Sequence, residues 1–306
     1  TTGGFVRILE LSNYPGAQLR AHRERRWAEN QRRFDARREQ VEQINREAQQ
    51  KFEARLADHE AEVERLRGEI EAPRGNGWWR RYRTKATLRK AERRRPPPPL
   101  LHPDPPPPTR AEIVLTREEA KLAAGIEGED LVADALAGLL GDEWTLVRGY
   151  RNGRGEIDQL LLGPQGLTAI EVKHRNATVF VDGDVWRFQK YDNYGNLVKE
   201  GSITEGRGRS PSQQLKESVA ALEEFLAKRG QPLEVNPVVI LSHPRGMVGK
   251  ADNRTVGIAS EPSHILELID QWDDRLDPER LPAIERLIVK DHEFHEQRLQ
   301  ARGRSS

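Results

Sequence analysis

GEIDQLLLGPQGLTAIEVKH, residues 155–174, places charged residues inside a stretch that otherwise has the composition of two hydrophobic strands. The strand-like runs are 156–162 and 167–174, and the Gly-Pro-Gln-Gly between them is a turn signature. The stretch therefore predicts a β-hairpin. Burial of an unpaired charge costs several kcal/mol, so the charged positions either lie on a solvated face or form a site.

The spacing of Asp158, Glu171 and Lys173 distinguishes these two interpretations. Side chains alternate along a strand, so Glu171 and Lys173 share one face. If the turn has an even number of residues, Asp158 lies directly opposite Glu171, with Cβ atoms about 5 Å apart. Such like charges destabilise the pair unless a cation lies between them. An odd turn with a bulge at Gly166 would instead put the two carboxylates on opposite faces.

A helix upstream supplies a third carboxylate. Thr116 and Glu119 have the spacing of a capping box, which predicts a helix extending to about Leu140. Its apolar residues form one stripe, and Glu129 falls in the middle of it. A glutamate centred on an apolar face requires a partner, unless the carboxylate reaches solvent from the edge of the stripe.

The three carboxylates and the lysine described above form a set that suits phosphodiester cleavage. Mg²⁺ prefers carboxylate oxygens and keeps several waters, one of which can become the attacking hydroxide. We therefore expect Asp158, Glu171 and Glu129 as metal ligands. Lys173 would orient the water or offset charge on the scissile phosphate.

The motifs G-E-I-D and G-P-x-G-L-x-x-I-E-V-K resemble the nuclease-related domain, NERD, of the PD-(D/E)xK nuclease superfamily. Further matches are G-x-E-G-E at 125–129, Trp186, and Pro-Ser-Gln-Gln at 211–214. The resemblance covers roughly Ile113 to Leu241, and nothing before Arg110. Ser210 departs from the family pattern, which usually has Asn before the proline.

The resemblance implies an α/β fold with a restriction-endonuclease-like mixed sheet flanked by helices. It also implies a divalent metal, Mg²⁺ or Mn²⁺, and cleavage of nucleic acid. Glu129, Asp158, Glu171 and Lys173 take the superfamily's acidic and lysine positions. Gln214 matches a glutamine near the site in many members; its other interpretation is a solvated polar residue.

The N-terminal part of the chain has a different character. After a tail of residues 1–19, residues 20–72 predict a long charged helix with a thin, coiled-coil-like apolar seam that includes Trp27, Phe34, Val41 and Val63. Such a seam would pair with a second copy, a protein partner or a neighbouring domain. The alternative is a solvated single helix held by charge pairs at i,i+4.

Residues 73–95 form a basic segment with interleaved aromatic residues, and 96–109 form a Pro-rich linker expected as a stiff polyproline II spacer. Basic residues neutralise phosphates and exposed aromatics stack on unpaired bases. The same composition suits an anionic membrane surface, an acidic partner or a solvated segment. The candidate nucleic-acid contacts are Trp78, Trp79, Arg80, Arg81, Tyr82, Arg83 and Lys85. Residues 110–306 would form the nuclease-like domain with its C-terminal helices.

Composition limits the kinds of partner, metal site and cellular location that the chain can have. The 306 residues carry 50 Lys+Arg against 49 Asp+Glu, so net charge alone predicts no nucleic-acid binding. The absence of cysteine excludes disulfides and thiolate metal sites. No run resembles a signal peptide or the ~20 apolar residues of a membrane span, so we expect a cytoplasmic protein without a membrane partner. His292 and His295, on a charged final helix, are expected to be solvated.

The leading hypothesis is a Mg²⁺-dependent nuclease, with DNA favoured over RNA. The alternatives are a catalytically inactive, nuclease-like module that binds nucleic acid, and a coiled-coil adaptor whose α/β part is a docking module. Clustered carboxylates favour the first, because a non-cutting module has little reason to keep them together.

Overall fold

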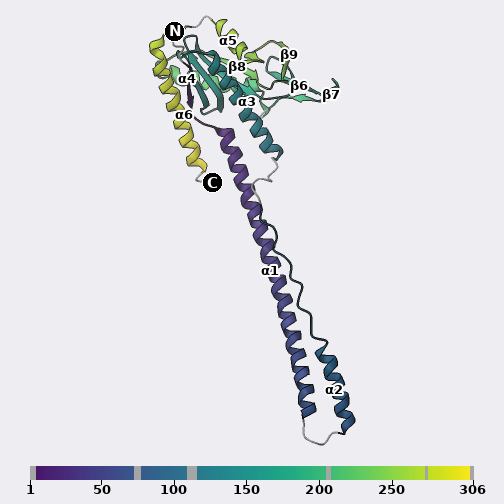
Figure 1. Cartoon of the computed structure of the whole chain (residues 1–306). Coiled ribbons are helices and arrows are strands. Elements are labelled where there is room, and N and C mark those ends of the chain that lie inside the picture. The colour runs from purple at the N-terminus through teal and green to yellow at the C-terminus, as the bar shows by residue number, and fades with distance from the viewer. Residues whose placement is uncertain (1–4, 72–76, 109–115, 205–207, 273–274, 304–306) are drawn as a thin grey trace. The chain divides into compact units, whose positions relative to one another are not determined.

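The computed structural model describes residues 5–71, 77–108, 116–204, 208–272 and 275–303 (Figure 1). The chain divides into two compact units, one made of residues 1–22 and 115–306 and the other of residues 23–114. Three sequence expectations lie outside the described residues. They are the start of the basic segment at 73–76, the expected domain boundary at 109–110 and the start of the family resemblance at 113.

The first unit is built on a mixed sheet. Within the described residues its strand order is β1-β2-β3-β4-β8-β10. β2, β3 and β4 pair antiparallel, whereas β1 joins β2, β8 joins β4, and β10 joins β8 in parallel. The strands are β1 (Arg7–Glu10), β2 (Thr145–Arg151), β3 (Glu156–Gly163), β4 (Gly166–Lys173), β8 (Val235–Leu241) and β10 (Gly257–Ala259).

Helices cover both faces of this sheet (Figure 1). α3 (Arg117–Leu139) and α5 (Pro262–Asp270) pack on one face, against Leu161 and Ile170. α4 (Pro211–Ala227) and α6 (Leu281–Gly303), which follows the 3₁₀ turn η3 (Pro278–Arg280), pack on the other, against Leu160 and Ala169. Alternating residues of β3 and β4 thus face opposite cores. The mixed sheet flanked by helices confirms the predicted fold class.

A second sheet was not expected from the sequence. Its strands, in the order β7-β6-β5-β9 within the described residues, are β7 (Leu197–Ser202), β6 (Val185–Tyr191), β5 (Thr178–Asp182) and β9 (Met247–Asp252). Trp186 of β6 is buried, and its Nε1 donates to Ser212 Oγ at 3.0 Å. This hydrogen bond joins the second sheet to the first turn of α4.

Both α3 and α4 begin with a capping box, and the one at α3 was predicted from the sequence. The Glu119 main-chain N–H donates to Thr116 Oγ1 at 3.2 Å, and the Thr116 N–H donates to Glu119 Oε2 at 2.8 Å. Ser210 and Gln213 make the same reciprocal pair at the start of α4. Ser210 therefore serves as the helix cap despite its departure from the family's Asn.

The expected N-terminal tail, residues 1–19, is partly a strand. β1 pairs in parallel with β2, and Arg7 lies beside Thr145, 138 residues away in sequence. Val6 is buried in the core on the α3 side of the sheet. The tail expectation was wrong here because parallel pairing between distant segments leaves no local pattern.

The expectation of a solvated His292 was also wrong. Its side chain is buried, and its Nδ1 accepts a hydrogen bond from the Arg151 main-chain N–H at 3.1 Å. His292 follows the buried Ile288 by one turn, so it lies on the face of α6 that packs on β2. His295 is partly buried, with Nε2 3.7 Å from Asp291 Oδ1.

The second unit contains most of α1 (Tyr14–Glu71) and all of α2 (Trp78–Glu92), so the predicted long helix is present. α2 returns along the end of α1, where Arg67 pairs with Glu92 at 3.1 Å and His59 Nε2 lies 2.8 Å from the Ala91 carbonyl oxygen. Val63 and Leu66 of α1 are buried here. At this end of α1, α2 of the same chain covers the apolar seam.

The Pro-rich segment is neither helix nor strand over 96–108, as expected, but it is not a free spacer. It follows α1 in Figure 1. Asn45 Nδ2 donates to the His102 carbonyl oxygen at 2.9 Å, and the His102 N–H donates to Asn45 Oδ1 at 2.8 Å. Among the described residues, no helix has the length and apolar character needed to cross a membrane.

Candidate active site

The β3–β4 hairpin has the even turn that brings the two carboxylates together. Gly163 pairs with Gly166, so only Pro164 and Gln165 lie between the paired positions. The same register continues to Gln159 opposite Ile170. One position further along it, Asp158 faces Glu171. The even-turn prediction is confirmed, and both carboxylates lie on the α4 side of the sheet, alternating with Gln159 and Ile170.

The two strands separate at this position, and we call the opening the fork. β3 continues to pair with β2 as far as Glu156, while β4 continues to pair with β8 as far as Lys173. Asp158 Oδ2 accepts a hydrogen bond from the Val172 main-chain N–H at 2.7 Å. The Asp158 carboxylate thus reaches across the fork and accepts a β4 main-chain hydrogen bond beyond the end of the β3–β4 pairing.

Glu171 and Lys173 form an ion pair on β4. Lys173 Nζ donates to Glu171 Oε1 at 2.5 Å, and the two side chains are 11% and 4% exposed for Lys173 and Glu171. Two residues apart on a strand, they project from the same face. The fork therefore holds a cationic group directly beside its carboxylates.

Burial raises the pKa of Asp158 above its ordinary value, and the charges of Glu171 and Glu129 raise it further. The Lys173 ammonium and the Val172 N–H oppose this shift. The free energy of ionising Asp158 is thus increased by its acidic neighbours, and a divalent cation at the fork would lower it.

Glu129 lies on α3, partly buried. Burial raises its pKa to about 7, with further contributions from the charges of Glu156 and Glu171, while Arg148 opposes the shift. The main-chain oxygen of Glu129 accepts from Gln159 Nε2 at 2.8 Å, which fixes this turn of α3 on β3. Glu129 is therefore within electrostatic range of the fork carboxylates. Its direct part in the site stays a prediction.

Glu156 is a further acidic neighbour of the site. It lies two residues before Asp158 on the same face of β3, with Oε2 2.5 Å from Arg151 Nη2 and Oε1 accepting from Ser12 Oγ at 3.3 Å. Burial raises the pKa of Glu156, and Glu171 raises it further. The i,i+2 spacing of Glu156 and Asp158 in the GEID motif was the available signal, but sequence reasoning assigned Glu156 no role.

Gln214 lies on the second turn of α4 and is half-buried. Within the described part of the chain, no side-chain hydrogen bond joins it to the fork. One turn later, the Ser218 carbonyl oxygen accepts from Asn152 Nδ2 at 2.8 Å, and Gly155 approaches Ser218 closely. α4 thus passes beside the turn that leads into β3, and a role for Gln214 stays a prediction.

The candidate nucleic-acid contacts in the second unit all lie on α2, namely Trp78, Trp79, Arg80, Arg81, Tyr82, Arg83 and Lys85. The three aromatic side chains are between 62% and 65% exposed. The rings of Trp78 and Trp79 are 3.8 Å apart between centroids and tilted by 32°. α2 therefore presents aromatic faces and cations to solvent.

The residues at the fork fit a magnesium ion with two protein ligands. No three His, Asp or Glu side chains are gathered into a ready-made metal site among the described residues, and Glu129 as a third ligand stays a prediction. Mg²⁺ commonly binds through one or two carboxylates and keeps its other ligands as water. Asp158 and Glu171, at facing positions of one register, supply that pair.

Comparison with known proteins gives one family. The sequence model of the nuclease-related domain, NERD, matches residues 124–242. No curated protein and no solved structure matches the chain. The matched segment runs from within α3 to the residue after β8, and it contains the fork, the second-sheet strands β5 to β7 and α4. Residues 124–242 of this chain are therefore similar to the nuclease-related domain.

Proposed function

We propose that this protein is a metal-dependent nuclease that hydrolyses phosphodiester bonds of DNA, or of RNA, at the fork. The observation that carries the proposal is that Asp158 and Glu171 take facing positions one step beyond the last β3–β4 pair, with Lys173 bound to Glu171, inside the segment that matches the nuclease-related domain model. Two carboxylates and one lysine at a strand opening are the groups that such a reaction uses.

Asp158 and Glu171 would hold Mg²⁺ or Mn²⁺, which when bound polarises a phosphoryl oxygen and makes a water more acidic. The Val172 N–H keeps the Asp158 carboxylate directed across the fork. The Lys173 ammonium, held by Glu171, is placed to offset charge that develops on the scissile phosphate. Glu129, with its pKa near 7, can accept a proton from water at neutral pH.

The decisive experiment compares the full chain with three near-isosteric variants, Asp158→Asn, Glu171→Gln and Lys173→Gln. Cleavage of circular DNA, linear DNA and RNA is measured with Mg²⁺, Mn²⁺ or EDTA. Each variant should lose activity by a factor of about 10²–10³, the usual effect of removing one charge-stabilising group. EDTA should abolish cleavage by the wild-type chain.

Matched controls come from exposed positions of α3, namely Asp134→Asn, Glu118→Gln and Lys121→Gln, which should cleave as the wild type does. Near-wild-type cleavage by folded Glu171→Gln would sink the assignment of the site. A wild-type chain that binds DNA but cuts no substrate with either metal would favour the inactive nucleic-acid-binding module.

A further inference from the structure

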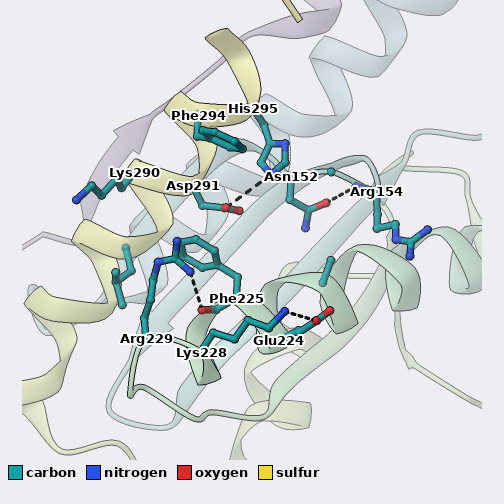
Figure 2. Close-up of a pocket in the computed structure, with 13 residues that line it drawn as sticks. Asn152, Arg154, Glu224, Phe225, Lys228, Arg229, Lys290, Asp291, Phe294 and His295 are labelled. Atoms are coloured by element: carbon teal, nitrogen blue, oxygen red, sulfur yellow. Dashed lines mark hydrogen bonds and ion pairs between the residues drawn. The ribbon is translucent and has the colours of Figure 1, made fainter. Parts of the chain in front are cut away.

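A pocket of about 850 Å³ lies between α4, α6 and the turn at Asn152–Arg154, on the same face of the sheet as the fork carboxylates (Figure 2). We call it the α4–α6 pocket. It is open to solvent on one side. The side chains that give it its chemical character are Arg154, Lys228, Arg229, Lys290, Phe225 and Phe294.

The α4–α6 pocket has more positive charge than its own carboxylates neutralise. Lys228 pairs with Glu224 at 2.5 Å, and Asp291 accepts a hydrogen bond from the buried Tyr150 hydroxyl at 2.6 Å. In the part of the chain that the structure describes, Arg154 and Lys290 form no ion pair. Four cationic side chains, Arg154, Lys228, Arg229 and Lys290, thus line the pocket against the two carboxylates Glu224 and Asp291, and this excess of positive charge suits phosphate groups.

The pocket also presents planar surfaces. The Arg229 guanidinium lies over the Phe225 ring, 3.8 Å from its centroid. Phe294, on the opposite wall, is 53% exposed. Figure 2 shows both phenyl rings at the pocket between the two helices. Aromatic rings and guanidinium planes are the surfaces on which unpaired bases stack.

The pocket is connected directly to the strand that carries Asp158. Asn152 Oδ1 accepts from the main-chain N–H groups of Arg154 and Gly155 at 2.9 and 3.2 Å, which fixes the turn. β3 begins at the next residue, Glu156. Arg154 precedes Asp158 by four residues, so their Cα atoms are at most about 13 Å apart. A bound strand can therefore reach both places.

We propose that the α4–α6 pocket binds a segment of single-stranded nucleic acid beside the fork. Its phosphates contact Arg154 and Lys290, and a base stacks on Phe294. The inference rests on the proposed nuclease function for the identity of the strand as substrate, whereas binding in the pocket does not require cleavage. A single strand fits better than a duplex, because paired bases cannot reach aromatic rings inside a concave pocket.

The test uses the full chain in EDTA, so that binding is measured whatever the outcome of the cleavage assays. Fluorescence anisotropy follows a labelled single-stranded oligonucleotide across a salt titration. Arg154→Gln/Lys290→Gln should weaken binding and flatten the log–log salt slope by about 0.7 per lost contact, or about 1.4 in total. Phe294→Ala should weaken binding roughly five- to 100-fold with little change in slope.

The matched control is Arg117→Gln/Lys121→Gln, which removes the same charge from exposed positions of α3 on the opposite face of the sheet and should change neither quantity. An unchanged slope in folded Arg154→Gln/Lys290→Gln would overturn the inference. So would a nucleoside monophosphate that competes as well as the oligonucleotide, or a duplex that binds equally and is insensitive to Phe294→Ala. If the wild type cuts nucleic acid but these variants bind normally, the pocket proposal alone fails.

Discussion

Asp158 is held by the backbone of the neighbouring strand. Where the β3–β4 pairing stops, its carboxylate accepts the Val172 N–H that a paired strand would otherwise bind. The carboxylate is therefore fixed in direction, yet its neighbours Glu171 and Glu129 make ionisation harder. A site that concentrates like charges lowers the stability of the fold, and such conflicts are expected where function requires them.

The destabilisation caused by these neighbouring carboxylates can be tested through the pH dependence of folding stability, with Glu129 as the titrating group. Its folded pKa of about 7 is above its ordinary value of 4.5. Between these values the unfolded chain releases a proton that the folded chain keeps, so stability falls as pH rises and the loss is complete above about pH 7. The glutamine in Glu129→Gln does not titrate, so the variant does not lose stability at this position as pH rises. At pH 8 it should be more stable than the wild type, by about 1–3 kcal/mol after solvent screening.

Urea unfolding of both chains at pH 4 and pH 8, in EDTA, measures this difference, which should vanish at the lower pH. The nearby carboxylates Asp158 and Glu156 are present in both chains, so the comparison reports the charge of Glu129 together with its repulsion of these neighbours. Mg²⁺ added at pH 8 should stabilise the wild type more than Glu129→Gln if this side chain serves the metal. A stability difference independent of pH would contradict the raised pKa.

At the level of residues, the sequence was informative wherever the rule was local. The two-residue turn at Pro164–Gln165 fixes the register, so the facing positions of Asp158 and Glu171 followed from side-chain alternation alone. Burial of Glu156 and His292 did not follow, because Glu156 contacts Ser12, 144 residues away, and His292 contacts Arg151, 141 residues away. A contact between residues that are distant in sequence leaves no recognisable sequence pattern around either of them.

The same division holds for whole elements. A capping box and an apolar stripe predicted the start of α3, because helices are stabilised by neighbours three and four residues apart. β1 escaped prediction because four residues, Arg7–Glu10, have too little length for a pattern, and their partner β2 is distant. The second sheet, with its exposed and polar strands, likewise lacks a clean alternation of apolar residues.

Proline substitutions in β1 test whether this strand belongs to the sheet. The N–H groups of Arg7 and Leu11 donate to the Trp144 and Arg148 carbonyl oxygens. By alternation, the N–H of Leu9 also faces β2, whereas that of Ile8 points away from it. Leu9→Pro should therefore lower the melting temperature of the full chain clearly more than Ile8→Pro, because only the former loses a ladder hydrogen bond.

Leu9→Ala separates the loss of the partly buried side chain from the loss of the hydrogen bond, and it should fall between the two proline variants. Differential scanning fluorimetry of the three proteins gives the ranking. Equal melting temperatures for Leu9→Pro and Ile8→Pro would mean that residues 7–10 do not pair with β2 in solution.

At the scale of the whole molecule, the segment that matches the nuclease-related domain model makes up part of one unit, and the second unit is a hairpin of α1, α2 and the Pro-rich segment. The exposed aromatic side chains of this second unit that could contact a ligand are on α2, where no described residue is buried. α1 is also rich in charge, but its arginines alternate with acids, as in the pairs Arg33–Glu29 and Arg38–Glu42. Within the described part of this unit, cations and tryptophans that are more than half exposed occur together on α2.

We therefore expect α2 to contribute a second contact to nucleic acid, separate from the α4–α6 pocket. Replacing Arg83, Lys85, Arg89 and Lys90 by Gln keeps helix propensity and removes four charges from α2. If all four contact phosphates, binding should weaken for every sequence alike and the salt slope should flatten by about 3, at roughly 0.7 to 0.9 per contact. Cleavage at saturating substrate and low salt should persist, since the fork is unchanged.

The matched control removes four arginines from α1, namely Arg32, Arg33, Arg37 and Arg38, and should leave the slope nearly unchanged because acids on the same helix already neutralise that surface. Filter binding across a salt series, together with liposome sedimentation, separates the possible partners. Loss of liposome association without a change in slope would assign α2 to an anionic membrane surface. Equal flattening in the α2 and α1 variants would show that the net charge of the second unit, and not the tryptophan-flanked face of α2, governs binding, whereas an α2 variant with the wild-type slope would show that α2 contacts no phosphates.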